Sequence, residues 1–104
     1  MIYNFDLTVD CIESRKNYTF CPESLHIHKV HFSIGLEAEA VKNEEETYFD
    51  LIDCVSSSAY IDKEWSLRLI AETIMEELLS QNFRVVKVKV RMAELPASLE
   101  ITNV

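Results

Sequence analysis

The chain has 104 residues, 48% of them hydrophobic, and a formal net charge of −8 from 18 acidic and 10 basic residues. This length suits a single domain over residues 1–104, and the acidic balance argues against nucleic acid and membranes as partners. No apolar run is long enough for a transmembrane helix and no signal peptide is apparent. Three cysteines, an odd number, fit the cytoplasm better than a disulfide framework.

Two segments near the N-terminus alternate between apolar and polar residues, which predicts β-strands. In residues 2–12 the odd positions are apolar, and Cys11 continues that side. In residues 25–40 the even positions are apolar, and His26 and His28 precede them with the same parity. The alternation therefore predicts that the thiol and both imidazoles point inward.

These three inward residues would meet if the two strands formed an antiparallel hairpin, because the end of the first strand would then lie beside the start of the second. A thiolate and two imidazoles suit Zn²⁺, and three protein ligands leave a fourth position open, as in catalytic zinc sites. Two simpler interpretations remain open at this point. The histidines could bond to backbone or to each other, and the cysteine could be a small core residue.

The middle of the chain predicts two helices. Residues 42–46 form an acidic turn, and apolar residues then recur at helical spacing over residues 47–57. A second helix is expected over about residues 64–81, with Asp62 or a neighbour as its N-cap. Cys54, on the first helix, is expected in the core.

The C-terminal part predicts two further strands, over residues 83–93 and 98–104. Lys87, Lys89 and Arg91 share one face of the first of these, and they are either solvated or face a partner. Its apolar face comprises Val86, Val88, Val90 and Met92. The order β-β-α-α-β-β predicts an α+β fold, with a four-stranded antiparallel sheet and two helices on one face.

This order resembles the tunnelling fold of purine- and pterin-handling enzymes, and its best match is the family of 6-pyruvoyltetrahydropterin and 6-carboxytetrahydropterin synthases. That family has Phe-x-Phe-x-Ala-Ala-His in its first strand, then a cysteine, then Leu-His-Gly-His opening its second strand. Here residues 5–11 occupy the first pattern and Cys21 stands at the expected cysteine. Residues 25–28 match the last pattern, with Ile27 in place of glycine.

The resemblance implies a lyase of pterin metabolism, in folate- or queuosine-related biosynthesis, that acts as a homo-oligomer on a small-molecule pterin. It implies that Zn²⁺ is held by Cys11, His26 and His28. It also implies that Cys21 is the catalytic, proton-shuttling thiol and that Glu94 binds the substrate. In the family, zinc holds the side-chain hydroxyls of a dihydropterin triphosphate while that side chain is remodelled.

The chain also departs from the family pattern. Glu94 stands two places later than the family's pterin-binding glutamate, and Arg68 replaces the glutamate of the helix motif. The connection over residues 56–63 holds no histidine, although the family has an Asp-His pair between its helices. The metal site could therefore be kept while the reaction is altered or lost. Arg15, Lys16 and Lys29 are candidates to receive phosphate or are simply exposed charges.

Two alternatives compete with this interpretation. Dihydroneopterin aldolases share the fold, need no metal and have a similarly short connection between their helices. Their pterin-binding glutamate, however, is replaced here by Arg68 or Leu69, and their Lys-Pro motif by Arg91-Met92. The other alternative is a non-catalytic member of the fold that binds a ligand or assembles with itself.

Overall fold

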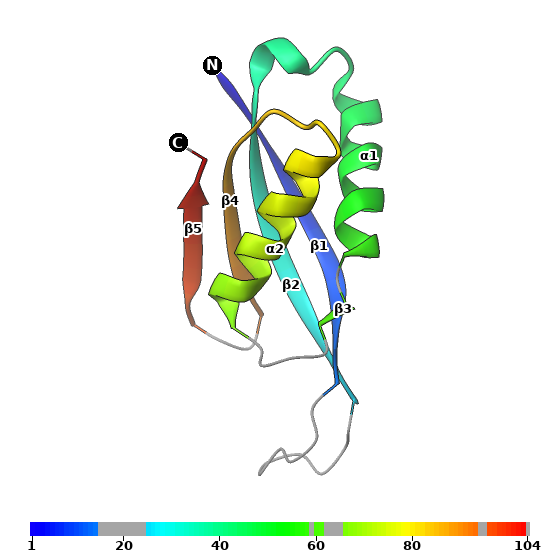
Figure 1. Cartoon of the computed structure of the whole chain (residues 1–104), viewed down its shortest axis with the longest axis vertical. Helices are drawn as coiled ribbons and strands as arrows, with labels where there is room; N and C mark the ends of the chain where they lie inside the picture. Colours follow the sequence, from blue (N-terminus) through cyan, green and yellow to red (C-terminus); the bar gives the residue numbers. More distant parts are fainter. Residues whose placement is uncertain (15–24, 59, 62–65, 94–95, 104) are drawn as a thin grey trace.

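The described part of the chain starts with a long β-hairpin and ends with two further strands, with two helices between them (Figure 1). The computed structural model describes residues 1–14, 25–58, 60–61, 66–93 and 96–103, and it describes their side chains except those of 11–14, 25–28 and 60–61. The elements are β1 (Ile2–Ser14), β2 (Leu25–Glu37), the 3-10 helix η1 (Ala38–Ala40), α1 (Glu44–Ser57), β3 (Tyr60–Ile61), α2 (Leu67–Ser80), β4 (Val85–Met92) and β5 (Ser98–Thr102).

Five described strands form one sheet in the order β3-β1-β2-β4-β5. The four longer strands pair antiparallel, whereas the two-residue β3 pairs parallel with β1. Both helices lie over the same face of the sheet (Figure 1). The predicted α+β fold, with a four-stranded antiparallel sheet and two helices, is therefore confirmed. The short β3 adds to it, and two residues are too few to give a periodic signal.

The hydrophobic core lies between the two helices and the sheet face that they cover. Val30, Phe32, Ile34 and Leu36 of β2 are at most 2% exposed, which confirms the predicted inward parity of this part of the strand. Burying a side chain of this kind contributes about 1.5–3 kcal/mol. The other fully buried large side chains are Leu7 on β1, Leu51 and Val55 on α1, Ile70, Ile74 and Leu78 on α2, and Val88 on β4.

A β-bulge interrupts the pairing of β2 with β4. Gly35 lies opposite Lys87 and Leu36 lies opposite Val85, so that Val86 is an extra residue on β4. The bulge lets Val85 face the core although it is three residues from Val88, which also does. The expectation that Val86 shares a face with Val88, Val90 and Met92 is therefore wrong, because those three belong to the core with Val85 whereas the half-buried Val86 does not pack against it.

Both helices start at residues that cap them. Asn43 Oδ1 accepts a hydrogen bond from the Glu46 backbone N–H at 2.9 Å, so α1 begins at Glu44, three residues earlier than expected. Carboxylates in the first turn of a helix interact favourably with its dipole. Ser66 Oγ accepts from the Leu69 N–H at 3.0 Å, so α2 begins at Leu67. Asp62, the cap expected from the sequence, lies outside the described residues.

The second strand is shorter than its pattern predicts. It ends at Glu37, and Ala38–Ala40 form η1, in which the Val41 N–H donates to the Ala38 carbonyl at 3.1 Å. The apolar alternation continued through the alanines, but alanine has little preference for strands. Neither of the two described helices has the length and apolar character that a membrane span requires.

The burial of α1 predicts a contrast between two of its residues. Leu51 is 0% exposed, whereas Phe49 is 56% exposed. Leu51→Ala should lower the free energy of unfolding by about 2–5 kcal/mol, because it removes transfer energy and leaves a cavity. Phe49→Ala should change it by no more than about 0.5 kcal/mol. Urea unfolding followed by circular dichroism checks this, and equal losses would contradict the packing of α1.

A hydrogen bond joins the start of β1 to the start of α1. The Tyr3 hydroxyl donates to Glu44 Oε1 at 2.9 Å. The bond and the adjacent negative charge raise the pKa of Tyr3. The pKa of Glu44 is lowered by its backbone hydrogen bond and then by the Tyr3 hydroxyl. The contact is therefore strongest when the carboxyl is ionised and the phenol is protonated.

The opposite pKa shifts of Tyr3 and Glu44 predict how the effect of Tyr3→Phe on stability depends on pH. A lowered carboxyl pKa gives stability that is present above the unfolded-state value, about 4.3, and is lost as pH falls through the folded-state value. A raised phenol pKa gives stability that is present below about pH 10 and is lost as pH rises further. The stability difference between wild type and Tyr3→Phe should therefore be constant at neutral pH and shrink at both extremes. Denaturant unfolding at a series of pH values measures it, and a difference that grows toward acid would contradict the bond.

Candidate functional site

The backbone of the β1–β2 hairpin brings together two of the three predicted metal ligands. Cys11 lies directly opposite His28 in the antiparallel register, and Glu13 lies opposite His26. The side chains of these four residues lie outside those that the structure describes, as do Cys21 and Glu94 as whole residues. The structure thus gives the register of the hairpin, and the zinc ligands remain a prediction.

The described parts of both strands follow the alternation on which that prediction depends. Phe5, Leu7 and Val9 are buried on β1, and each lies opposite a buried residue of β2. Cys11 and His28 are the next residues of the same parity along the two strands. Among the described side chains, no three His, Cys, Asp or Glu residues gather into a possible metal site.

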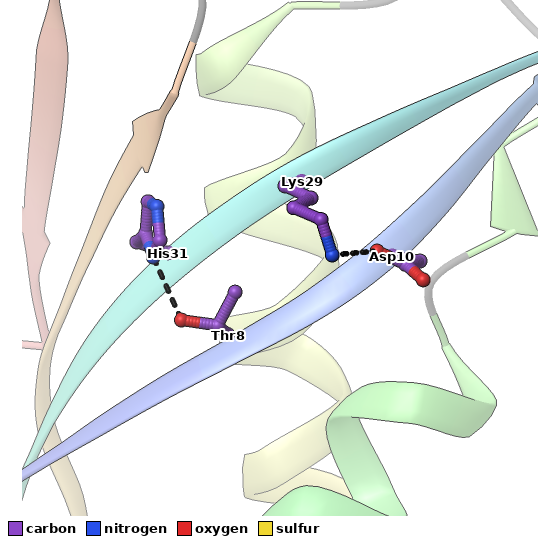
Figure 2. Close-up of polar contacts among 4 residues, drawn as sticks. All are labelled: Thr8, Asp10, Lys29 and His31. Carbon is purple, nitrogen blue, oxygen red and sulfur yellow. Dashed lines mark hydrogen bonds and ion pairs between the residues drawn. The ribbon is translucent and has the colours of Figure 1, made fainter.

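The opposite face of the sheet, away from the helices, is polar. Figure 2 shows Thr8 and Asp10 of β1 and Lys29 and His31 of β2 in front of the two strands, with the helices behind them. Thr8 Oγ1 and His31 Nδ1 lie 2.7 Å apart, and Lys29 Nζ donates to Asp10 Oδ1 at 3.5 Å. Lys29 therefore pairs with a neighbouring carboxylate on this face.

A groove of about 480 Å³ crosses this polar face over β1, β2 and β4. It is lined by two basic side chains of β4, Lys89 and Arg91, and by His31. The sequence identified the basic stripe but did not single out His31. A signal that could have identified His31 is its position among polar residues on three neighbouring strands of the sheet.

Cys54 lies in a separate hollow lined by residues of both helices. It packs against the core but is only partly buried, so the expectation that it is a core residue is met only in part. Burial raises the pKa of its thiol, and the negative charge of Glu77 raises it further. A raised pKa disfavours the thiolate form of Cys54.

Arg68, which the resemblance aligns with the helix glutamate of the pterin synthases, bonds within its own helix. Its Nε donates to Glu72 Oε1 at 2.8 Å, one turn along α2, and both side chains are exposed. This bond and the charge of Glu72 raise the pKa of Arg68. The guanidinium therefore interacts with the helix surface rather than with any described groove.

Comparison with protein-family models finds no match for this sequence, and comparison with curated proteins finds none either. The resemblance to the pterin synthases thus depends on the motifs and on the order of the elements.

The polar face yields a prediction about Gly35. A Cβ at this position would lie 2.8 Å from Cγ of Lys87 and 3.1 Å from Cγ2 of Ile2. Gly35→Ala should therefore lower the free energy of unfolding by about 1–3 kcal/mol, because the Lys87 side chain must move.

A double-mutant cycle with Lys87→Ala tests the cause of this loss. Removing Cγ of Lys87 should reduce the cost of Gly35→Ala by about 1 kcal/mol in denaturant unfolding. The same cost in both backgrounds would show that the contact with Lys87 is not the reason for glycine here.

Proposed function

We propose that this chain is a zinc-assisted lyase of pterin metabolism, similar to the 6-pyruvoyltetrahydropterin and 6-carboxytetrahydropterin synthases. Its zinc ligands are Cys11, His26 and His28. The observation that carries the proposal is the register of the hairpin, in which Cys11 lies opposite His28.

The donor set and the register fit a zinc ion. Zinc binds thiolate sulfur at about 2.3 Å and imidazole nitrogen at about 2.0–2.1 Å, so its ligand atoms lie within about 4 Å of each other. Opposite residues of antiparallel strands have Cα atoms about 4.5–5.5 Å apart, and the second histidine is two residues further along the same strand. Two adjacent strands can therefore supply all three ligands.

When bound, the zinc would act as a Lewis acid on the hydroxyls of the substrate side chain. The role that falls to Cys21 is to take and return protons as a thiolate, and Glu94 would hold the pterin ring through hydrogen bonds. Cys54, whose raised pKa disfavours the thiolate, is not part of this proposal. The substrate is a dihydroneopterin or its triphosphate, and the enzyme acts in the cytoplasm.

The proposal includes assembly into a homo-oligomer. In the described sheet β5 forms one edge, and the other edge is the two-residue β3 on β1. An edge strand offers unpaired backbone groups to a neighbouring chain. Pairing of copies at these edges would extend the sheet.

The zinc site predicts a contrast among the three histidines of the chain. Protein purified without an affinity tag should hold about one zinc per chain. His26→Ala and His28→Ala should each lose it, because two protein ligands hold zinc far less well than three. His31→Ala is the matched control, because His31 lies on the same strand with the opposite parity and bonds to Thr8.

Elemental analysis of the four proteins checks this contrast. Full retention of zinc in both His26→Ala and His28→Ala would contradict the proposed site. Equal loss in His31→Ala would show that the effect is not specific to the proposed ligands.

The aldolase alternative is favoured by one observation, the short chain between the end of α1 at Ser57 and the start of α2 at Leu67. It is a metal-free enzyme that acts on dihydroneopterin. Turnover of dihydroneopterin without zinc would support it, whereas zinc-dependent turnover of the triphosphate would support the lyase. Turnover of neither substrate would support the other alternative, a non-catalytic member of the fold that binds a ligand or assembles with itself.

A further inference from the structure

The groove on the open face of the sheet gathers polar side chains from three strands. It has a volume of about 480 Å³. Two of its lining residues, Thr8 and His31, lie on the side of the sheet away from the helices (Figure 2). Its polar lining residues are Asp6 and Thr8 on β1, His31 and Ser33 on β2, and Lys89 and Arg91 on β4. They alternate with core residues such as Leu7, Phe32 and Val90.

The strand register orders these side chains into two rows. Thr8, His31 and Arg91 lie opposite one another across the three strands. Asp6, Ser33 and Lys89 form the next row on the same face. Neighbouring strands are about 4.8 Å apart, and rows on one face are about 6.6 Å apart. The two basic side chains of β4 are therefore close enough to contact a single anion.

Among the described residues, two other lysines of this face are paired with carboxylates, and Asp6 is the carboxylate that lines the groove itself. Lys29 pairs with Asp10, and Lys87 pairs with Glu100 at 3.9 Å. Lys89 lies opposite the same Glu100 in the register. Within the described residues, however, neither Lys89 nor Arg91 belongs to an ion pair.

His31 adds a hydrogen-bond donor whose ring is held by its contact with Thr8. Its Nδ1 lies 2.7 Å from Thr8 Oγ1, which leaves Nε2 as the other ring nitrogen (Figure 2). When the threonine hydroxyl donates to Nδ1, the neutral ring carries its proton on Nε2 and can donate it to a ligand. The Ser33 hydroxyl, on the neighbouring row of the same strand, is a further donor.

We propose that this groove binds the phosphate group of a small phosphorylated molecule. Arg91 offers a planar pair of N–H donors, Lys89 offers a point charge, and His31 and Ser33 complete a set that suits a tetrahedral oxyanion. The groove is larger than one phosphate group, so that the remainder of the ligand would extend along it. This inference does not depend on the zinc lyase, because these residues alternate with those of the helix-covered face.

Titration with inorganic phosphate, followed by backbone amide NMR shifts, tests the proposal. The amides of Thr8, His31 and Arg91 should shift in a saturable way. Arg91→Gln and Lys89→Gln should each weaken binding about tenfold, because each removes a charged hydrogen-bond donor. Both residues are exposed, so the variants should fold.

Two further variants separate a site from a general effect of charge. Arg68→Gln removes the same charge from the exposed side of α2, and it should leave the phosphate affinity within about twofold. Asp6→Asn removes the one carboxylate among the described residues that line the groove, and it should strengthen binding. Absence of saturable shifts, or an equal loss in Arg68→Gln and Arg91→Gln, would overturn the proposal.

The chemical class of the ligand is tested with two other anions. Glycerol phosphate should bind at least as tightly as inorganic phosphate, because the groove has room for its glycerol part. Acetate should bind about tenfold more weakly, because it offers fewer acceptor oxygens to the four donors. Equal affinity for acetate and phosphate would overturn the assignment to a phosphate group.

Discussion

The alternation of side chains along β1, β2 and β4, held in place by the helices over one face of the sheet, is the constraint on which this structure depends. Phe32 and Ile34 are almost fully buried beneath α1 and α2. A shift of one residue would exchange the apolar and polar faces, so burial of these side chains holds the register of the sheet. The same register aligns Cys11 with His28 on one parity and His31 with Arg91 on the other. Two proposed binding sites of different chemistry thus arise on opposite sides of a single sheet.

Much of this fold follows from the sequence, because long amphipathic strands and helices carry strong periodic signals. Three features of the fold do not follow from the periodic pattern, and each has its own physical reason. The start of α1 lacks apolar residues, and what marks it is Asn43 followed three residues later by Glu46, a capping pattern rather than a periodic one. The alternation along β4 predicts the wrong face for Val86 because it does not reveal a bulge, which depends on the partner strand. The two-residue β3 exists only through its pairing with β1.

The sites were less accessible to sequence reasoning than the fold. Pairing of Cys11 with His28 required the register of two strands, which the sequence suggested only through the assumption of a hairpin. Taken alone, His31 is one more polar residue on an outward face. Its significance comes from Thr8 and Arg91, which are 23 and 60 positions away in the chain and opposite it in the sheet. Residues far apart in the chain come together in this way because of the order of the strands in the sheet, and no local sequence pattern reveals that order.

The bulge at Val86 also determines which kinds of sequence change β4 can accept. From Lys87 to Met92 the residues of β4 alternate between the two sides of the sheet, and the position of the extra residue Val86 determines which side each one faces. Replacing one exposed lysine by another polar residue leaves this phase intact. Losing or gaining one residue within the strand would instead turn its cations toward the helices and its valines toward water. Relatives of this protein should therefore vary in β4 by substitution and accommodate differences in length outside the strand.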